Sequence, residues 1–150
     1  MNTRGNHKKL RRDRKFQPCP VEENDERFPN GIFDFNITKM VAFIERNRDQ
    51  VALGKVDVNS TRSGLTTHLD ESTIESADLS APIILAEISP GRYNLIDGHH
   101  RLERAFRLGK ETLPAYKLTA SQHIAFLTSQ RAYDAYVDYW NEKVEIQQQA

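Results

Sequence analysis

Residues 83–88 (Ile-Ile-Leu-Ala-Glu-Ile) form an almost continuous apolar run in the middle of the chain. A run of this kind is typical of a strand that is covered on both faces, because a half-exposed strand alternates apolar and polar residues. Ser89-Pro90-Gly91-Arg92 follows, and Pro-Gly suits the two central positions of a type II turn. Residues 93–96 then lead away as a second strand. The sequence therefore predicts a β-hairpin over residues 83–96.

A helix and a further strand follow this hairpin. Leu102, Ala105 and Phe106 have the i, i+3, i+4 spacing of a buried helical stripe, so we predict a helix over roughly residues 100–108. Gly109 is well placed to end it, since a glycine commonly follows the last helical residue. Residues 113–118 predict a strand with Pro114 at its start, where a missing N–H matters least.

The turn between the second strand and this helix, Asp97-Gly98-His99-His100-Arg101, carries most of the chemistry. A helix that starts directly after a strand points its unpaired N–H groups and the positive end of its dipole at one spot, which favours an anion. Gly98 lets backbone approach a ligand closely, and Arg101 can offer a bidentate fork to phosphate oxygens. We predict that Gly98, His99, His100 and Arg101 bind phosphate.

Two of these residues are also candidates for catalysis. His100 can donate or accept a proton near neutral pH. Asp97 can orient a histidine or hold a metal ion on the phosphates. The turn lacks the Gly-Lys-Ser/Thr of a P-loop and the further glycines of a dinucleotide fingerprint. An alternative zinc site of His99, His100, His123 and a carboxylate is disfavoured, because adjacent histidines seldom face one ion.

Upstream of the hairpin, the sequence predicts short strands and helices. Residues 31–37 predict a strand, and Thr38 is a plausible N-cap for the helix that follows. The buried stripe of that helix is expected to comprise Met40, Val41, Phe43 and Ile44. Residues 55–58 predict another strand, and Asp70 or Ser72 opens a second helix.

After residue 118 we expect one long helix. Thr119 and Gln122 can form a capping box at its start, and a broad aromatic stripe follows with Tyr133, Tyr136 and Trp140. The preferred interpretation is that this stripe covers the domain's own sheet. The alternative is the contact face of a homodimer, because so many aromatic residues at one end exceed what a small core requires.

Charge is unevenly distributed, although 21 basic and 21 acidic residues cancel. A net charge of zero argues against a globally basic DNA-coating protein. Residues 1–29 have few apolar residues and dense charge, so we predict a disordered leader, followed by one domain over residues 30–150. The basic residues of the leader gather near its start: Arg4, Lys8, Lys9, Arg11, Arg12, Arg14 and Lys15. This block is either a solvated tail or an arm that contacts nucleic acid.

The chain has neither an apolar run long enough to span a membrane nor an apolar N-terminal signal core. Cys19 is its only cysteine, which excludes an internal disulfide and fits a reducing compartment. We therefore expect a cytoplasmic protein without a membrane partner.

Residues 82–118 resemble the core that the ParB N-terminal domain and sulfiredoxin share. The shared pattern is a proline and an apolar strand, a turn, a second strand, Gly-x-x-Arg, a helix, a glycine, and an apolar-Pro pair before another strand. Asp97-Gly98-His99-x-Arg101 is most similar to the Asp-Gly-His-x-Arg of the ParB-like free serine kinase branch. The resemblance implies a small α+β or α/β domain, with a mixed sheet of four or five strands flanked by helices.

The resemblance also implies a ligand. The turn at residues 97–101 would bind the phosphates of a nucleotide (ATP, ADP or CTP), most securely through Arg101, and Mg²⁺ is expected because phosphoryl transfer needs charge neutralisation. Arg62 would be a second phosphate ligand. Further contacts or candidate bases would come from Ser63, Thr66, Thr67, Asp57 and Glu71.

Two departures limit which activity carries over. Sulfiredoxin needs a cysteine where this chain has His99, so repair of oxidised peroxiredoxin is not expected. His99 and His100 replace the Glu-Arg of the ParB motif, which puts CTP clamping in doubt. Two functions stay open. One is a nucleotide hydrolase or phosphotransferase that uses Asp97 and His100. The other is a non-catalytic ParB-like DNA-binding or regulatory module, related to partition proteins or to nucleases.

Overall fold

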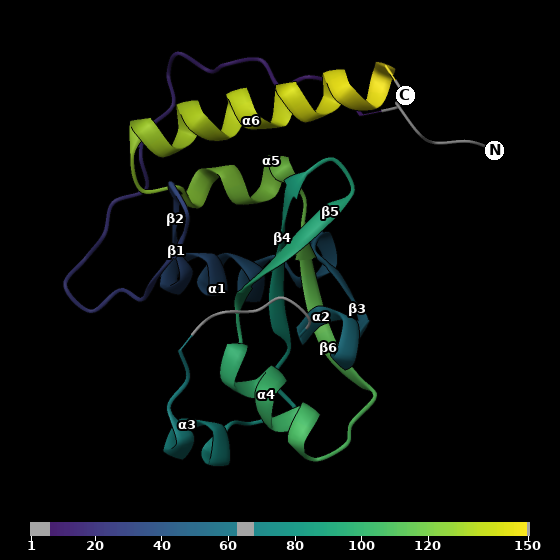
Figure 1. The fold of residues 1–150 in the computed structure, drawn as a ribbon. Helices are drawn as coiled ribbons and strands as arrows, with labels where there is room; N and C mark the ends of the chain where they lie inside the picture. Colours follow the sequence, from purple (N-terminus) through teal and green to yellow (C-terminus); the bar gives the residue numbers. More distant parts are fainter. Residues whose placement is uncertain (1–6, 63–67, 150) are drawn as a thin grey trace.

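The central sheet has four strands in the order β3-β6-β4-β5 (Figure 1). The computed structural model describes residues 7–62 and 68–149. The strands of this sheet are β3 (Ala52–Asp57), β4 (Ile83–Ser89), β5 (Arg92–Asp97) and β6 (Thr112–Leu118). β4 pairs antiparallel with β5 and parallel with β6, and β3 pairs antiparallel with β6. The predicted mixed sheet in an α+β fold is confirmed.

β4 lies inside the sheet, and all of its residues are buried. Its successive side chains point to opposite faces and enter two separate cores. Ile84, Ala86 and Ile88 join the first core, whereas Ile83 and Leu85 join the second. The helices that supply side chains to the first core are α1 (Ile37–Arg46), α5 (Ala120–His123) and α6 (Gln130–Gln149). Those that supply the second are α2 (Val58–Arg62) and α4 (His99–Arg107).

The single strand predicted over residues 31–37 is instead an antiparallel hairpin of β1 (Arg27–Asn30) and β2 (Phe33–Asn36). β1 therefore starts inside the predicted leader. The N-cap of α1 is Asn36 and not Thr38, because the Asn36 side chain accepts the Lys39 N–H (3.0 Å). The Thr38 hydroxyl is used elsewhere and accepts the backbone N–H of Glu26 (2.7 Å).

The long helix predicted after residue 118 is interrupted. The capping box of residues 119–122 is present at the start of α5, and a 3-10 turn, η2 (Ile124–Phe126), follows. Helical geometry then ends because Leu127 forms a β-bridge with Phe35 of β2. α6 begins at Gln130 and runs for 20 residues. Two further short elements are η1 (Arg48–Gln50) and α3 (Glu71–Ser76).

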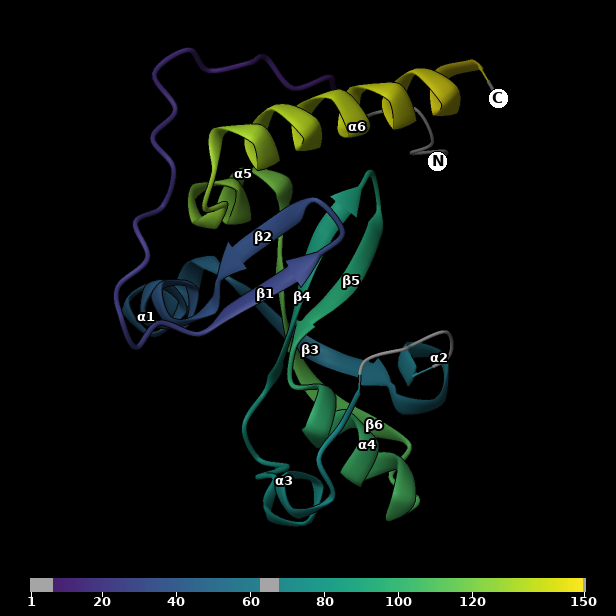
Figure 2. The same ribbon diagram turned by 60° about the vertical axis from the view of Figure 1, so that its left-hand side comes forward.

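Residues 7–19, called the N-terminal segment below, run alongside α6 (Figures 1 and 2). Leu10 and Phe16 pack against the first core, and Cys19 is buried in it. The aromatic stripe of α6 is buried in the same core, which confirms that it packs within the domain. The disorder predicted for residues 1–29 and the homodimer stay predictions. None of the described helices is long and apolar enough to cross a membrane.

A buried polar cluster joins α5 and α6 to β4. The backbone carbonyl of Glu87 accepts hydrogen bonds from His123 Nε2 (2.6 Å) and from the Tyr136 hydroxyl (2.6 Å). The Glu87 carboxylate accepts the backbone N–H groups of Gly91 (2.9 Å) and Ala120 (3.2 Å). Burial lowers the pKa of His123 to about 4. Its imidazole is therefore neutral at neutral pH and donates from Nε2.

We expect His123 to make the protein less stable as the pH falls from 6.5, its ordinary pKa, to about 4. In this range unfolding lets the imidazole take up a proton, so the free energy of unfolding is highest above the unfolded pKa and decreases below it. The limit of this loss is about 3 kcal/mol. Urea unfolding of the wild type and of His123→Gln at pH 7 and pH 4.5 tests this prediction.

Glutamine keeps an N–H donor near the position of Nε2 but does not titrate. The destabilisation caused by His123→Gln should therefore be smaller at pH 4.5 than at pH 7. The same destabilisation at both pH values would contradict the prediction.

Candidate functional site

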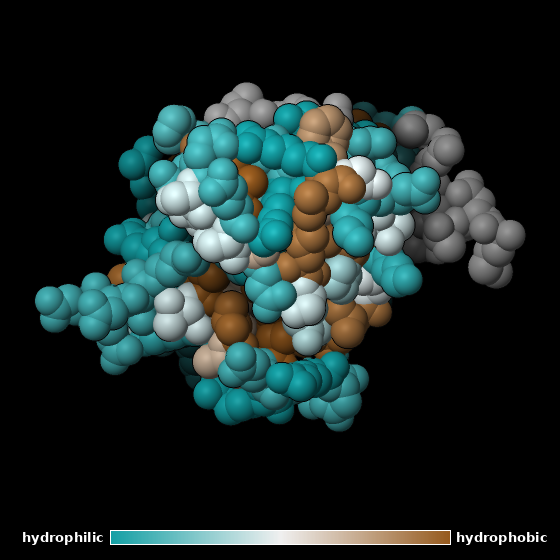
Figure 3. Space-filling view, turned by 90° about the horizontal axis from the view of Figure 1, so that it is seen from below, coloured by the Kyte–Doolittle hydropathy of each residue, from teal (hydrophilic) through white to brown (hydrophobic). Residues whose placement is uncertain are grey.

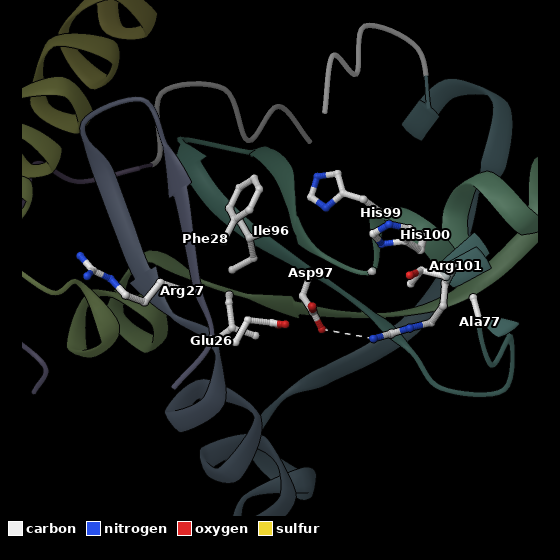
Figure 4. Close-up of a pocket in the computed structure, with 12 residues that line it drawn as sticks. Glu26, Arg27, Phe28, Ala77, Ile96, Asp97, His99, His100 and Arg101 are labelled. Carbon is white, nitrogen blue, oxygen red and sulfur yellow. Dashed lines mark hydrogen bonds and ion pairs between the residues drawn. The ribbon is translucent and has the colours of Figure 1, made fainter. Parts of the chain in front are cut away.

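A pocket of about 400 Å³ opens where β5 ends and α4 begins (Figure 4). Its walls come from the start of β1, the first residue of α1, the α3 region and the β5–α4 turn. The lining residues are Glu26, Arg27, Phe28, Ile37, Thr73, Ala77, Ile96, Asp97, Gly98, His99, His100 and Arg101. All five residues of the predicted turn therefore line one pocket.

Gly98 is the N-cap of α4 and the point at which the chain leaves β5. Its φ of 103° lies in the left-handed region that favours glycine. A Cβ atom at this position would lie 2.5 Å from Cγ2 of Ile83 and 2.9 Å from its Cβ. Both the conformation and the contact with β4 thus require glycine. No side chain caps α4, so the N–H groups of its first turn are available to a ligand.

Arg101, the predicted principal phosphate ligand, is already bonded within the protein. Its Nη2 lies 3.3 Å from Oδ2 of Asp97. Its Nη1 donates to the carbonyl oxygens of Ala81 (3.4 Å) and Pro82. These bonds tie the start of β4 to the end of β5. A guanidinium has five N–H donors, so Arg101 retains donors for a ligand in the pocket.

The two histidines of the turn contact different parts of the fold. His99 is 9% exposed, and its ring stacks on Phe28 of β1 with 5.0 Å between centroids. Burial lowers the pKa of His99, which favours its neutral form. His100 Nε2 accepts the backbone N–H of Asp70 (3.2 Å), so a neutral His100 carries its proton on Nδ1.

Asp70 links His100 to α3. Of the two predicted caps, it is Asp70 that acts as the N-cap, by accepting the Thr73 N–H (3.0 Å) and the Ser72 hydroxyl (2.6 Å). These hydrogen bonds lower the pKa of Asp70 to about 2. His100 is thereby held between α4 and the first turn of α3, beside a permanently ionised carboxylate.

Glu26 is a pocket residue that the sequence analysis missed. Its side chain points toward Asp97 (Figure 4). Burial raises the pKa of Glu26, and the neighbouring Asp97 carboxylate raises it further, while Arg101 opposes both effects. Glu26 lies in the predicted leader and far along the chain from residue 97. Only the packing of β1 beside β5 brings the two carboxylates together, and no local signal in the sequence indicates it.

Arg62, the predicted second phosphate ligand, does not line the pocket. Its Nε donates to Oε1 of Glu103 (2.7 Å), and its guanidinium lies 3.8 Å above the ring of Phe106.

The helical stripe predicted for α4 is confirmed for Leu102 and Ala105, which are buried, but Phe106 is 39% exposed. Phe106, on α4, and Leu108, just after its end, are both exposed. Figure 3, seen from the α3–α4 end, shows apolar side chains among hydrophilic ones.

The other candidates also lie outside the pocket. Asp57 accepts the backbone N–H of Ser60 (2.8 Å) at the start of α2. Glu71 accepts two hydrogen bonds from Arg107 (2.6 and 3.0 Å). The predicted contacts at Ser63, Thr66 and Thr67 fall outside the described residues. Over residues 7–62 and 68–149, no three His, Cys, Asp or Glu side chains gather as a metal site requires. The three histidines of the alternative zinc site are therefore not brought together.

Comparison with known proteins adds one finding. Residues 58–127 match the family model of the ParB N-terminal domain. This part of the chain is ParB-like. The matched residues begin at α2 and end just after η2, so they include β4, β5, α4 and the whole turn at residues 97–101. Glu26, the β1–β2 hairpin and α6 lie outside the match. No curated protein and no solved structure was found to match the chain.

We predict that Gly98→Ala destabilises the fold by about 2–6 kcal/mol, the sum of left-handed backbone strain and a clash with Ile83. Gly109→Ala is the matched control. Gly109 also has a positive φ, 73°, but a Cβ there meets no atom within 4 Å. Its cost should be limited to the strain of about 1–3 kcal/mol. Urea unfolding measures both, and equal destabilisation by the two substitutions would contradict the predicted clash.

Proposed function

We propose that the pocket of this ParB-like domain binds the phosphates of a nucleotide (ATP, ADP or CTP) together with Mg²⁺. The observation that supports this most directly is the uncapped first turn of α4, which faces a pocket of about 400 Å³ beside Arg101. Unpaired N–H groups and the positive end of a helix dipole favour an anion. Arg101 adds a full positive charge at the same place.

In this proposal the backbone of the turn holds phosphate oxygens. The N–H groups of His99, His100 and Arg101 would donate to them, and Gly98 would keep the approach free of a side chain. The guanidinium of Arg101 would add charged hydrogen bonds from donors that Asp97 and the carbonyl groups just before β4 leave unused.

Asp97 is suited to hold Mg²⁺. This ion prefers oxygen ligands and is usually bound by one or two carboxylates plus substrate phosphates. Asp97 lines the pocket at the β5–α4 turn, and the second carboxylate of the lining, Glu26, stays free for proton transfer. Bound Mg²⁺ would supply charge neutralisation for phosphoryl chemistry. It would also take over the Asp97 carboxylate, so that Arg101 could turn toward the phosphates.

Turnover requires a proton acceptor, and Glu26 is the candidate. Its burial raises its pKa, which makes its ionised form a stronger base toward water or an acceptor hydroxyl. His100 could exchange a proton through Nδ1. The reaction would then be nucleotide hydrolysis or phosphate transfer.

The alternative is a ParB-like regulatory or DNA-binding module that binds nucleotide without turnover. One observation favours it. His100 and Arg101 are both hydrogen-bonded to backbone groups of the protein, so both groups act as structural links. In that case nucleotide would stabilise the contact between α3 and α4 without being consumed.

Calorimetric titration of ATP, ADP and CTP in Mg²⁺ tests the proposal. Arg101→Ala should weaken binding about tenfold or more, as expected for the loss of a charged hydrogen bond of about 1.5–3 kcal/mol. Arg104→Ala is the matched control. Arg104 is on the same helix and its Nη1 also donates to a loop carbonyl, that of Ala77 (2.8 Å), but it does not line the pocket.

The two variants should have similar thermal midpoints, so that a difference in affinity reports the pocket. The phosphate site would be refuted if the wild-type protein bound none of the three nucleotides, or if both variants lost the same amount of nucleotide affinity. If binding is found, phosphate release by the wild type and by Glu26→Gln separates turnover from simple binding.

A further inference from the structure

Contacts between the N-terminal segment and the rest of the fold recur at intervals of three residues. The ring of His7 lies edge-on to Trp140, with 6.0 Å between centroids. The ring of Phe16 stacks on Tyr133 at 4.0 Å. Ring stacking, burial or main-chain hydrogen bonds of this kind recur at His7, Leu10, Asp13, Phe16 and Cys19. One side of the segment is therefore turned toward α6 and the residues just before it, and Lys9 and Arg12, between these positions, also reach α6 with their side chains.

The polar side chains of α6 hold this segment by its main chain. The Asn141 side chain accepts the N–H of Leu10 (2.6 Å) and donates to its carbonyl oxygen (3.0 Å). Trp140 Nε1 donates to the carbonyl oxygen of Lys8 (2.9 Å). The Tyr133 hydroxyl accepts the N–H of Asp13 (2.6 Å). These bonds fix the course of the segment without using its basic side chains.

The basic side chains divide into two groups. Lys9 and Arg12 pair with acids of α6: Lys9 lies 3.7 Å from Glu145, and Arg12 contacts Asp138 and lies 3.5 Å from Asp134. The remaining cations are exposed, and within the described part of the chain none of them is in an ion pair. We call these four residues the basic ridge: Lys8, Arg11, Arg14 and Lys15.

We propose that the basic ridge binds the phosphate backbone of a nucleic acid duplex, independently of the pocket at residues 97–101. The ridge spans eight residues, which in an extended chain reach at most about 25 Å, enough to follow several phosphates. Its cations are held in place by the docked main chain, so binding loses less conformational entropy than it would with a free tail.

The surroundings of the ridge favour a duplex over other polyanions. Single strands are usually bound by stacking bases on exposed aromatic rings, and the ring of Phe16 is already stacked on Tyr133. A membrane surface is usually bound by basic residues beside exposed apolar ones. Leu10 and Phe16 are turned toward the first core instead. On its exposed side the segment offers four cations against the single acid Asp13, without an exposed aromatic ring, which suits sequence-independent contact with the duplex backbone.

The test compares two variants with the same net charge. The ridge variant carries Lys8→Ala, Arg11→Ala, Arg14→Ala and Lys15→Ala. The control variant carries four substitutions of exposed cations elsewhere, Arg46→Ala, Lys55→Ala, Arg92→Ala and Lys110→Ala. Binding of a labelled 20-base-pair DNA duplex is followed by fluorescence anisotropy between 50 and 200 mM NaCl, without nucleotide.

Four phosphate contacts predict that the affinity of the wild type falls about 100-fold over this salt range, and that the slope of log K against log salt is about 3.6 steeper in the wild type than in the ridge variant. Arg11→Ala alone should reduce the slope by about 0.9, which keeps the test valid if the fourfold variant does not fold. The control variant should bind within about threefold of the wild type, since its charges lie outside the contact.

Three results would overturn the proposal: no duplex binding by the wild type at 50 mM NaCl, an equal loss in the control variant, or ridge-dependent binding to anionic vesicles without binding to DNA. Nucleotide titration of the ridge variant should match the wild type, which separates this proposal from the one for the pocket.

Discussion

β4 has no face in contact with water. Ile83 and Leu85 point into one core, and Ile84, Ala86 and Ile88 point into the other, so both halves of the molecule pack on this strand. The position of the turn at residues 97–101 depends on it in two ways. Gly98 lies against Ile83 so closely that no side chain fits between them. Arg101 then donates to the carbonyl oxygens at the entry to β4. The geometry of the pocket is therefore set by a rigid strand and is not a property of a loop.

The pocket has two origins. The turn and α4 belong to the part of the chain that matches the ParB N-terminal domain. The opposite wall, with Glu26, Arg27 and Phe28, comes from the start of the β1–β2 hairpin, which lies outside that match. The shared part supplies the uncapped helix and the arginine, whereas the unshared part supplies a carboxylate of raised pKa and the aromatic ring that covers His99. Substitutions in the hairpin can alter what the pocket accepts while leaving the turn intact.

The sequence predicted most of the region from β4 to β6, because its signals are local. A Pro-Gly turn, a helical stripe and a glycine that ends the helix each act over a few neighbouring residues. The errors concern contacts between distant residues. Arg62 is implied as a phosphate ligand by the resemblance, and its ion pair with Glu103, 41 residues away on α4, is a contact that no local pattern indicates. Glu26 was overlooked for the same reason. The predicted single C-terminal helix failed at Leu127, whose backbone pairs with β2, and a capping box gives no information about such pairing.

The bonds between the N-terminal segment and α6 have a consequence for the folding of the chain during its synthesis. Leu10 and Asn141 are separated by 131 residues, yet translation proceeds from the N-terminus. At 5–20 residues per second, the helix that receives Leu10 is completed about 7–26 s after Leu10 itself. The N-terminal segment is thus synthesised well before the helix that holds it, and it is among the last parts of the fold to find its place. Throughout that interval the side chains of Leu10 and Phe16 are not yet buried in the first core, and Lys9 and Arg12 are not yet paired with the carboxylates of α6.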